Sequence, residues 1–278
     1  MATYHATAYA KINLALHVRS RRADGYHELE TVFAFLDKGD SLSMEKAERF
    51  SLDLEGPFGR NLAGEDYEAN LIYRAAKLHG DGVVPPVAFR LDKKLPIAAG
   101  LGGGSADAAA ALRLLNDASD APLGAEELHV IAAQLGADVP ACIDSLPVVG
   151  RGTGTILQPV ENDVSGMHCL LVNPNIAVAT GPVFKAWDGV DRGPMPEGSA
   201  RCILQDGRND LEPMALKICP EIGNILHELR KTNPLIARMS GSGATCFALF
   251  HDADALQHAA SEVSKKHPEW WTMAGRLR

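Results

Sequence analysis

Apolar and polar residues alternate along much of the first third of the chain, which is the pattern of half-buried β-strands. Residues 12–18, INLALHV, place Ile12, Leu14, Leu16 and Val18 on one face. The runs LETVFAFLD, FSLDL and VAFRL follow and are separated by glycine or charged clusters. We expect mostly antiparallel sheet in this part of the chain.

Helical spacing appears between and after these runs. It predicts helices that begin near Asn70 and end at His79, and at 105–116, about 126–135, about 220–231 and 253–265. Further strands are predicted for HCLLVN, ARM, TCFALF and WTMAGRL, and a Pro/Gly-rich segment covers 188–200. Because helices and strands do not alternate strictly, the pattern favours two packed α+β halves over a doubly wound parallel sheet.

The segment LQPVENDVSG is polar and rich in turn formers, so we place a domain boundary there. The predicted domains are 1–158 and 159–278, and 46% hydrophobic residues in a chain of 278 supply cores for both.

Composition narrows the class of protein. A formal net charge of -8 argues against broad binding to nucleic acid or to an anionic membrane. No apolar run reaches the roughly 18 to 20 residues of a membrane helix, and the N-terminus lacks the basic start of a signal peptide, so we expect a cytoplasmic protein. Five scattered cysteines without a C-x-x-C pair predict reduced, mostly buried thiols and no metal site of the protein's own.

The stretch LPIAAGLGGGSADAAAALRLLN sets glycines against an alanine-rich helix, with Ser105 expected as its N-cap. Glycine lets the backbone approach a ligand, and a helix N-terminus presents free N–H donors to an anion. A tight packing turn is the plainer explanation, but four glycines within 100–104 cost more conformational entropy than a turn requires. Lys93 and Lys94 also stand just before the loop, within reach of the same anion.

Three common phosphate loops do not fit this stretch. No Lys-Ser or Lys-Thr follows Gly104, as a Walker A loop requires. Ser105 stands where a dinucleotide fingerprint needs its third glycine, and the H-R-D and D-F-G segments of protein kinases are absent.

The segment PIAAGLGGGSADAAA resembles the central motif of the GHMP kinases, P-x-x-x-G-L-G-S-S-A-A. AYAKINLALHV near the N-terminus resembles the first motif of that superfamily, and MSGSGATCFALF resembles the third. The resemblance implies a two-domain α+β kinase with mixed or antiparallel sheets, helices packed on them and an active site in the cleft between the domains.

Within the superfamily, RADGYHELETVFAFLDKGD, LGADVPACI and NDLEP resemble the branch that phosphorylates 4-diphosphocytidyl-2-C-methyl-D-erythritol. The resemblance implies transfer of the ATP γ-phosphate to the 2-hydroxyl, which gives the 2-phosphate and ADP on the non-mevalonate route to isoprenoid precursors. The implied partners are that cytidine diphosphate substrate and ATP with Mg²⁺. The oligomeric state stays open between monomer and homodimer.

The resemblance implies that Asp138 is the catalytic base and that Lys11 orients the attacking hydroxyl and steadies developing charge. Taken alone, Asp138 two residues before Pro140 is typical of a helix N-cap, and Lys11 in an alternating strand is typical of a solvated edge lysine. By the period of two, Asn13 shares the face of Lys11 and is expected to bind the same substrate.

Tyr26 and His27 follow a D-G turn, where a packing tyrosine and a surface histidine are the plain expectation. The resemblance implies instead that Tyr26 stacks on cytosine and that His27 bonds its polar edge. Phe184 is then expected to cover the other face of the base, with Thr180 nearby.

The resemblance assigns the ATP phosphates to Lys93 and to the loop. The loop residues are Pro96, Ile97, Ala98, Ala99, Gly100, Leu101, Gly102, Gly103, Gly104, Ser105 and Ala106. Related kinases often read G-G-G-S-S-N here, so Ala106 lacks a hydroxyl and leaves Ser105, Asp107 or a water for any work on metal or phosphate. Two alternatives remain, another GHMP small-molecule alcohol kinase acting on mevalonate, homoserine or a sugar, and a non-catalytic nucleotide-binding module on the same fold.

Overall fold

The computed structural model describes residues 2–62 and 67–278. Its contacts divide the chain into two compact units that interleave along the sequence. Unit 1 comprises Met1–Ala10, Gly39–Ile97 and Gly102–Ser145, and unit 2 comprises Lys11–Lys38, Ala98–Leu101 and Leu146–Arg278. The interleaving arises because strands β1 (Thr3–Arg21) and β2 (His27–Lys46) contribute residues to both units. The continuous domains 1–158 and 159–278 stay a prediction.

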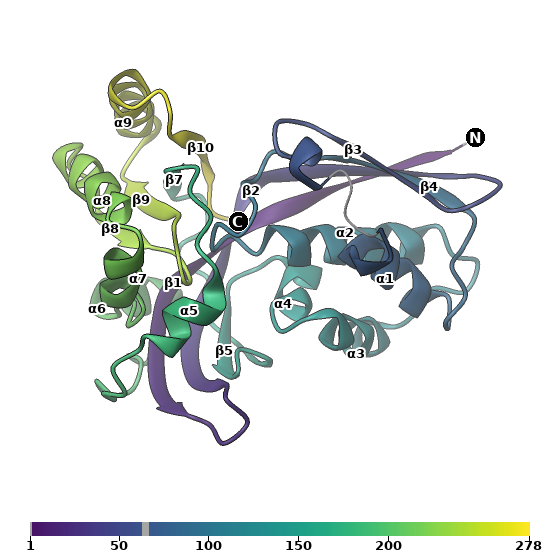
Figure 1. Ribbon diagram of the computed structural model, residues 1–278, viewed down its shortest axis with the longest axis horizontal. Coiled ribbons are helices and arrows are strands. Elements are labelled where there is room, and N and C mark those ends of the chain that lie inside the picture. Colours follow the sequence, from purple (N-terminus) through teal and green to yellow (C-terminus); the bar gives the residue numbers. More distant parts are fainter. Residues whose placement is uncertain (1, 63–66) are drawn as a thin grey trace. The chain divides into compact units, whose positions relative to one another are not determined.

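Unit 1 packs helices against a sheet. In the sheet, β2 pairs antiparallel with β4 (Val87–Asp92), which pairs parallel with β3 (Ser51–Glu55), and β1 pairs with β2. The helices are η1 (Gly59–Leu62), η2 (Tyr67–Ala69), α1 (Leu71–His79), α2 (Gly103–Asp117), α3 (Ala125–Leu135) and α4 (Val139–Asp144). Figure 1 shows α1 to α4 on one side of strands β3 and β4. The parallel β3/β4 pair departs from the expected antiparallel order, and α1 supplies the crossover that a parallel pair requires.

Unit 2 contains the first part of β2, which pairs antiparallel with β5 (Val148–Gly152), and β5 pairs with β6 (Ile156–Pro159). A separate antiparallel sheet has the order β10 (Trp271–Arg276), β7 (His168–Asn173), β9 (Cys246–Phe250) and β8 (Ile236–Met239). The helices are α5 (Thr180–Lys185), α6 (Ala200–Asp206), α7 (Glu212–Ile218), α8 (Glu221–Lys231) and α9 (Ala253–Lys266). Helices α8 and α9 lie against this sheet (Figure 1), and their apolar faces pack on Ala248 and Phe250 of β9 to form one core.

The longer predicted elements are confirmed, including the helix capped by Asn70, whose Oδ1 accepts from the N–H of Ile72 at 2.9 Å. One prediction at the glycine loop is wrong. The loop helix begins at Gly103 with Gly102 as its N-cap, so Ser105 lies in the first turn and makes no cap. Helices α5 to α7 were not predicted, because six or seven residues carry too little periodicity to be recognised.

The cysteines agree in large part with the prediction. All five are free, and Cys142, Cys169, Cys219 and Cys246 are buried, whereas Cys202 is exposed. Among the described residues, no helix is both long and apolar enough to span a membrane.

The loop segment Ala98–Leu101 is held by its backbone within unit 2. The carbonyl of Gly100 accepts from Ser240 Oγ at 3.0 Å, and the carbonyl of Ala99 accepts from the N–H of Thr245 at 3.2 Å. Gly100 has φ +75°, and a Cβ there would meet the carbonyl oxygens of Ser240 at 2.6 Å and Gly243 at 2.9 Å. The close packing of two glycine-rich segments therefore requires glycine at position 100.

We predict that Gly100→Ala lowers the free energy of unfolding by roughly 3 kcal/mol or more, because left-handed strain and a backbone clash add together. Gly166→Ala is the matched control, since Gly166 has φ +81° and nothing within 4 Å of an added Cβ. Strain alone then costs about 1 to 2 kcal/mol. Urea unfolding compares the two variants, and equal losses would contradict the role of the clash.

Candidate active site

Lys11 is buried and its ammonium is positioned by a chain of hydrogen bonds. Its Nζ donates to Asn13 Oδ1 at 3.0 Å, and Asn13 Nδ2 donates to Thr31 Oγ1 at 2.7 Å. The Thr31 hydroxyl in turn donates to the carbonyl of Ala15 at 2.6 Å. Lys11 is 4% exposed and its Nζ lies 5.2 Å from the centre of the Phe33 ring. The solvated-edge interpretation of Lys11 is therefore wrong, while the shared face of Lys11 and Asn13 is confirmed.

Residues of the first motif, of the glycine loop and of the third motif contact one another within unit 2. The N–H of Lys11 donates to the carbonyl of Leu101 at 3.0 Å, and the N–H of Asn13 donates to Ser240 Oγ at 3.1 Å. Ser240 itself donates to Gly100, as described above. The backbone of the first motif is thus bonded both to the loop and to the turn of the third motif.

Lys93 is buried in unit 1 between two carboxylates. Its Nζ lies 2.6 Å from Asp40 Oδ2 and 2.5 Å from Asp107 Oδ2, and all three side chains are at most 6% exposed. Asp40 Oδ1 accepts the backbone N–H groups of Lys94 and Leu95. The expected phosphate ligand is therefore engaged in a buried ion cluster, which we name the Lys93 cluster (Asp40, Lys93, Asp107).

The Lys93 cluster lies at the first turn of α2. A Cβ on Gly103 would stand 3.0 Å from Lys93 Nζ, so glycine makes room for the ammonium. The first intrahelical bond runs from the N–H of Ala106 to the carbonyl of Gly102 at 2.8 Å. The N–H groups of Gly103, Gly104 and Ser105 precede that bond, as the open donors of a helix N-terminus do.

The charges of the Lys93 cluster do not balance, since one ammonium faces two carboxylates. Burial raises the pKa of Asp107, the Lys93 ammonium opposes this and the Asp40 carboxylate adds to it, and the net pKa is about 7. For Lys93, burial lowers the pKa, but Asp107 and Asp40 outweigh it and the net shift is upward. Asp107 Oδ1 is buried with no hydrogen-bond partner among the described residues.

Asp138 stands at the start of α4, half-buried in unit 1. Its side chain makes no capping hydrogen bond within the described part of α4, and its backbone is helical, with φ -85° and ψ -16°. Asp138 therefore occupies the expected N-cap position of α4 without a side-chain capping bond, and Pro140 in the first turn adds a start signal.

Aromatic rings gather around His27 at the start of β2. The His27 ring centre lies 5.2 Å from that of Phe184 and 5.6 Å from that of Trp187, and His27 is 6% exposed. Tyr26 is 66% exposed beside it, and Thr180 Oγ1 lies 3.1 Å from Ser242 Oγ. The structure thus brings His27 and Phe184 together as expected, but buries the histidine rather than leaving it at the surface.

Several residues of these groups were not predicted from the sequence. Thr31 and Asp40 lie on the strand that follows the first motif, and Trp187 lies just beyond α5. A period-two pattern assigns a face to each strand residue but gives no partner on the next strand. The D-G-Y-H block carried the signal for Tyr26 and His27, whereas no local signal marked Trp187.

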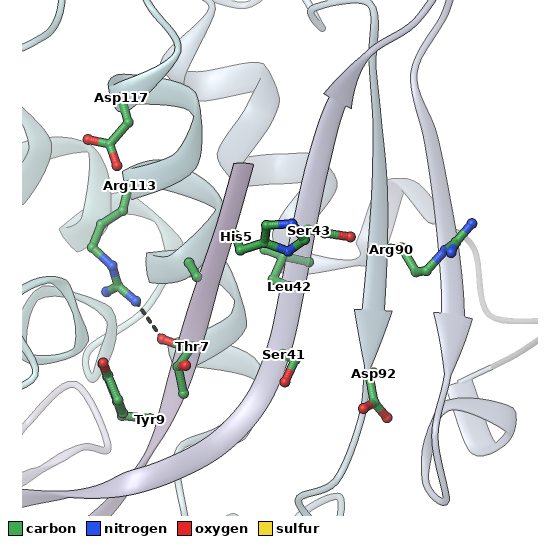
Figure 2. Close-up of a pocket in the computed structure, with 11 residues that line it drawn as sticks. His5, Thr7, Tyr9, Ser41, Leu42, Ser43, Arg90, Asp92, Arg113 and Asp117 are labelled. Carbon is green, nitrogen blue, oxygen red and sulfur yellow. Dashed lines mark hydrogen bonds between the residues drawn. The ribbon is translucent and has the colours of Figure 1, made fainter. Parts of the chain in front are cut away.

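A separate hollow of about 550 Å³ lies in unit 1 (Figure 2). It is lined by residues of β1, β2, β4 and α2, and none of the predicted site residues is among them. Arg113 points from α2 toward β1 and donates to the carbonyl of Thr7 at 2.8 Å. Because Arg113 also bonds the carbonyls of Cys142 and Ile143, its guanidinium serves the fold there.

Comparison with known proteins decides the family. Residues 70–145 match the model of the GHMP kinase N-terminal domain, and residues 197–269 match that of the GHMP kinase C-terminal domain. The chain belongs to the GHMP kinases. The α+β kinase fold predicted from its motifs is thereby confirmed.

Similar GHMP kinases include the 4-diphosphocytidyl-2-C-methyl-D-erythritol kinase of Novosphingobium aromaticivorans, 53% identical over 98% of this chain and 92% of the relative. The kinase of the same name from Erythrobacter litoralis is 50% identical over 98% of each chain. A crystal structure of 4-(cytidine 5'-diphospho)-2C-methyl-D-erythritol kinase superposes with a TM-score of 0.82, at 34% identity and 99% coverage of both chains. A mevalonate kinase from L. major, 16% identical with a TM-score of 0.71 over 99% of this chain and 96% of that one, shares the fold.

The described residues of this GHMP kinase contain no group of three or more His, Cys, Asp or Glu side chains placed to hold a metal ion. As a GHMP kinase the chain uses ATP, whose phosphate oxygens are themselves metal ligands.

We predict that the Lys93 cluster makes stability depend on pH. The pKa of Asp107 is raised from 3.8 to about 7, so the native state binds more protons than the unfolded state between those values. Its contribution to stability is full below pH 3.8 and is lost as the pH rises through about 7. Asparagine does not titrate, so Asp107→Asn does not lose this contribution. Between pH 5 and 8 the free energy of unfolding of wild type therefore falls by roughly 2 kcal/mol more than that of Asp107→Asn.

Urea unfolding at pH 5, 6, 7 and 8 measures this difference. Asp117→Asn, at the exposed end of the same helix, is the control and is expected to follow wild type at every pH. Parallel pH profiles for wild type and Asp107→Asn would contradict the prediction.

Proposed function

We propose that this GHMP kinase transfers the γ-phosphate of ATP to the 2-hydroxyl of 4-diphosphocytidyl-2-C-methyl-D-erythritol, giving the 2-phosphate and ADP in isoprenoid precursor biosynthesis. The chain is an ATP-dependent phosphotransferase with an alcohol acceptor. The observation that carries the substrate is the buried His27 with Phe184 against it and Tyr26 exposed beside it, in a chain 53% identical to a kinase of that name.

Two side chains act on the acceptor hydroxyl in this proposal. Asp138, at the start of α4, accepts its proton as general base, the role that the resemblance of its motif to the GHMP kinases implies. Lys11 directs its ammonium at the oxygen and stabilises the negative charge that develops there. The hydrogen bonds through Asn13 and Thr31 restrict that ammonium before substrate arrives, so little reorganisation is needed.

The ATP phosphates bind the backbone of the glycine loop and the open N–H groups at the start of α2. Lys93 has a different part from the one first expected. Because its ammonium is paired with Asp40 and Asp107, Lys93 holds the start of α2 in position and does not offer an unpaired charge to the phosphates. We assign Pro96 to Ala106 to nucleotide binding through backbone groups and the Ser105 hydroxyl.

Mg²⁺ fits this loop, because the cation keeps several waters and takes oxygen ligands from phosphates and one or two protein groups. Ser105 is half-buried in the first turn and offers a hydroxyl, whereas the Asp107 carboxylate is committed to Lys93. When bound, Mg²⁺ neutralises charge on the phosphate oxygens during transfer.

The cytosine ring lies between Tyr26 and Phe184 in this proposal, with His27 at its polar edge and Thr180 and Asn13 toward the rest of the substrate. Offset stacking of flat rings contributes about 0.5 to 1.5 kcal/mol for each pair beyond the area buried. A cytoplasmic location and the choice between monomer and homodimer stay predictions from the sequence.

A phosphotransfer assay with Mg·ATP tests the substrate. The panel contains 4-diphosphocytidyl-2-C-methyl-D-erythritol, mevalonate, homoserine and galactose, and only the first is expected to be phosphorylated at a rate above background. Phosphorylation of another alcohol in its place would support a different GHMP kinase activity. Phosphorylation of none, by protein that still binds ATP, would support a non-catalytic module.

We predict that Asp138→Asn lowers kcat at least about a hundredfold, which is the scale of a lost general base. Asp144→Asn is the control, because Asp144 ends the same short helix, has a side chain 65% exposed and pairs with His129. Steady-state kinetics with the cytidine substrate measure both variants. Near-normal turnover of Asp138→Asn would remove Asp138 from the chemistry.

A further inference from the structure

The imidazole of His27 is fixed in place by its neighbours in unit 2. Phe184 lies against it at 5.2 Å with the ring planes 41° apart, and Trp187 meets it nearly perpendicularly at 5.6 Å and 85°. His27 is 6% exposed and Trp187 is 5% exposed. With the ring held on two sides, the hydrogen bonds of its two nitrogens decide what it offers a ligand.

Arg21, the last residue of β1, donates a hydrogen bond to one of those nitrogens. Its Nε donates to His27 Nε2 at 3.4 Å, and its Nη2 donates to the carbonyl of Lys185 at 3.3 Å. A guanidinium has donors and no acceptor, so Nε2 of His27 accepts and carries no proton. The indole of Trp187 makes no hydrogen bond to His27, because its Nε1 is buried with no hydrogen-bond partner among the described residues.

The charge state of His27 agrees with this arrangement. Burial lowers the pKa of His27, and the positive charge of Arg21 lowers it further, so the imidazole stays neutral at neutral pH. A neutral imidazole with a bare Nε2 carries its proton on Nδ1.

We propose that Arg21 is a positioning residue that holds His27 as the Nδ1–H tautomer, and that this tautomer selects cytosine over uracil. The inference rests on the proposed function. At the pyrimidine edge, N3 of cytosine is an acceptor and N3 of uracil carries a proton. A fixed Nδ1–H donor pairs with cytosine N3 but meets a second donor on uracil, which leaves a buried donor unpaired.

Without Arg21 the selection weakens. A neutral histidine whose Nε2 has no donor facing it also populates the Nε2–H form, in which Nδ1 accepts. That form pairs with N3–H of uracil, so one side chain that touches neither base sets the preference between them.

The experiment compares wild-type protein with Arg21→Met, which keeps the length of the side chain and removes its donors. Arg22→Met is the control, because Arg22 is the next residue, is exposed and pairs with Asp24 and Glu28. Arg21→Lys tests whether a cationic donor restores the behaviour. All four proteins are used full-length.

Two readouts separate the tautomer from the chemistry. Two-bond proton–nitrogen NMR spectra of the ligand-free proteins at pH 8 report the tautomer of His27, whose signals are assigned by their loss in His27→Gln. Phosphotransfer with Mg·ATP gives kcat/KM for the cytidine substrate and for its uridine counterpart.

We expect the Nδ1–H tautomer in wild type, Arg22→Met and Arg21→Lys, and a shift toward Nε2–H in Arg21→Met. The ratio of kcat/KM for cytidine over uridine falls at least tenfold in Arg21→Met, through KM more than kcat, and is unchanged in Arg22→Met. A wild-type Nε2–H tautomer, or an unchanged ratio in Arg21→Met, overturns the inference. If wild type phosphorylates neither substrate, the proposed function and the selectivity fail together, while the NMR spectra still decide the tautomer.

Discussion

The burial of one ammonium between two carboxylates constrains how the sheet and α2 of unit 1 pack together. Lys93 connects Asp40 on β2 with Asp107 just beyond the first turn of α2, and loss of the ammonium would leave two buried carboxylates without a counter-charge, which typically costs about 3 to 5 kcal/mol. The cluster therefore places the start of α2 relative to the sheet. Position 103 favours glycine for the same reason, because the Lys93 ammonium lies where a side chain would begin.

The loop segment Ala98–Leu101, which belongs to unit 2, is held by hydrogen bonds to its carbonyl groups. The carbonyls of Gly100 and Ala99 accept from Ser240 Oγ and from the N–H of Thr245, and these bonds fix the backbone of the segment. In the described structure, the N–H groups of Gly103, Gly104 and Ser105 precede the first bond within α2, which the N–H of Ala106 donates. A loop that binds phosphate through its backbone needs glycine where neighbouring chains approach closely, and it needs few reactive side chains of its own.

How much of the site could be predicted depends on the range of the interactions. The common face of Lys11 and Asn13 followed from strand periodicity, and the order of the three motifs indicated the GHMP kinases. The burial of Lys11 could not be predicted, since it depends on Thr31 and Phe33 of the next strand. The start of α2 was placed at Ser105 because side-chain capping is a local signal, whereas the helix begins at Gly103 beside the Lys93 cluster.

The sequence by itself determined the main strands and helices, the family and the residue types that phosphoryl transfer requires, because periodicity and motif spacing are short-range properties of the chain. Only the tertiary structure decided which partner each polar group finds. Lys93 could have faced a phosphate or two carboxylates, and His27 could have carried its proton on either nitrogen. Those outcomes depend on Asp40, Asp107 and Arg21, which folding brings within hydrogen-bonding distance and buries with them, where an unpaired charge or donor is costly.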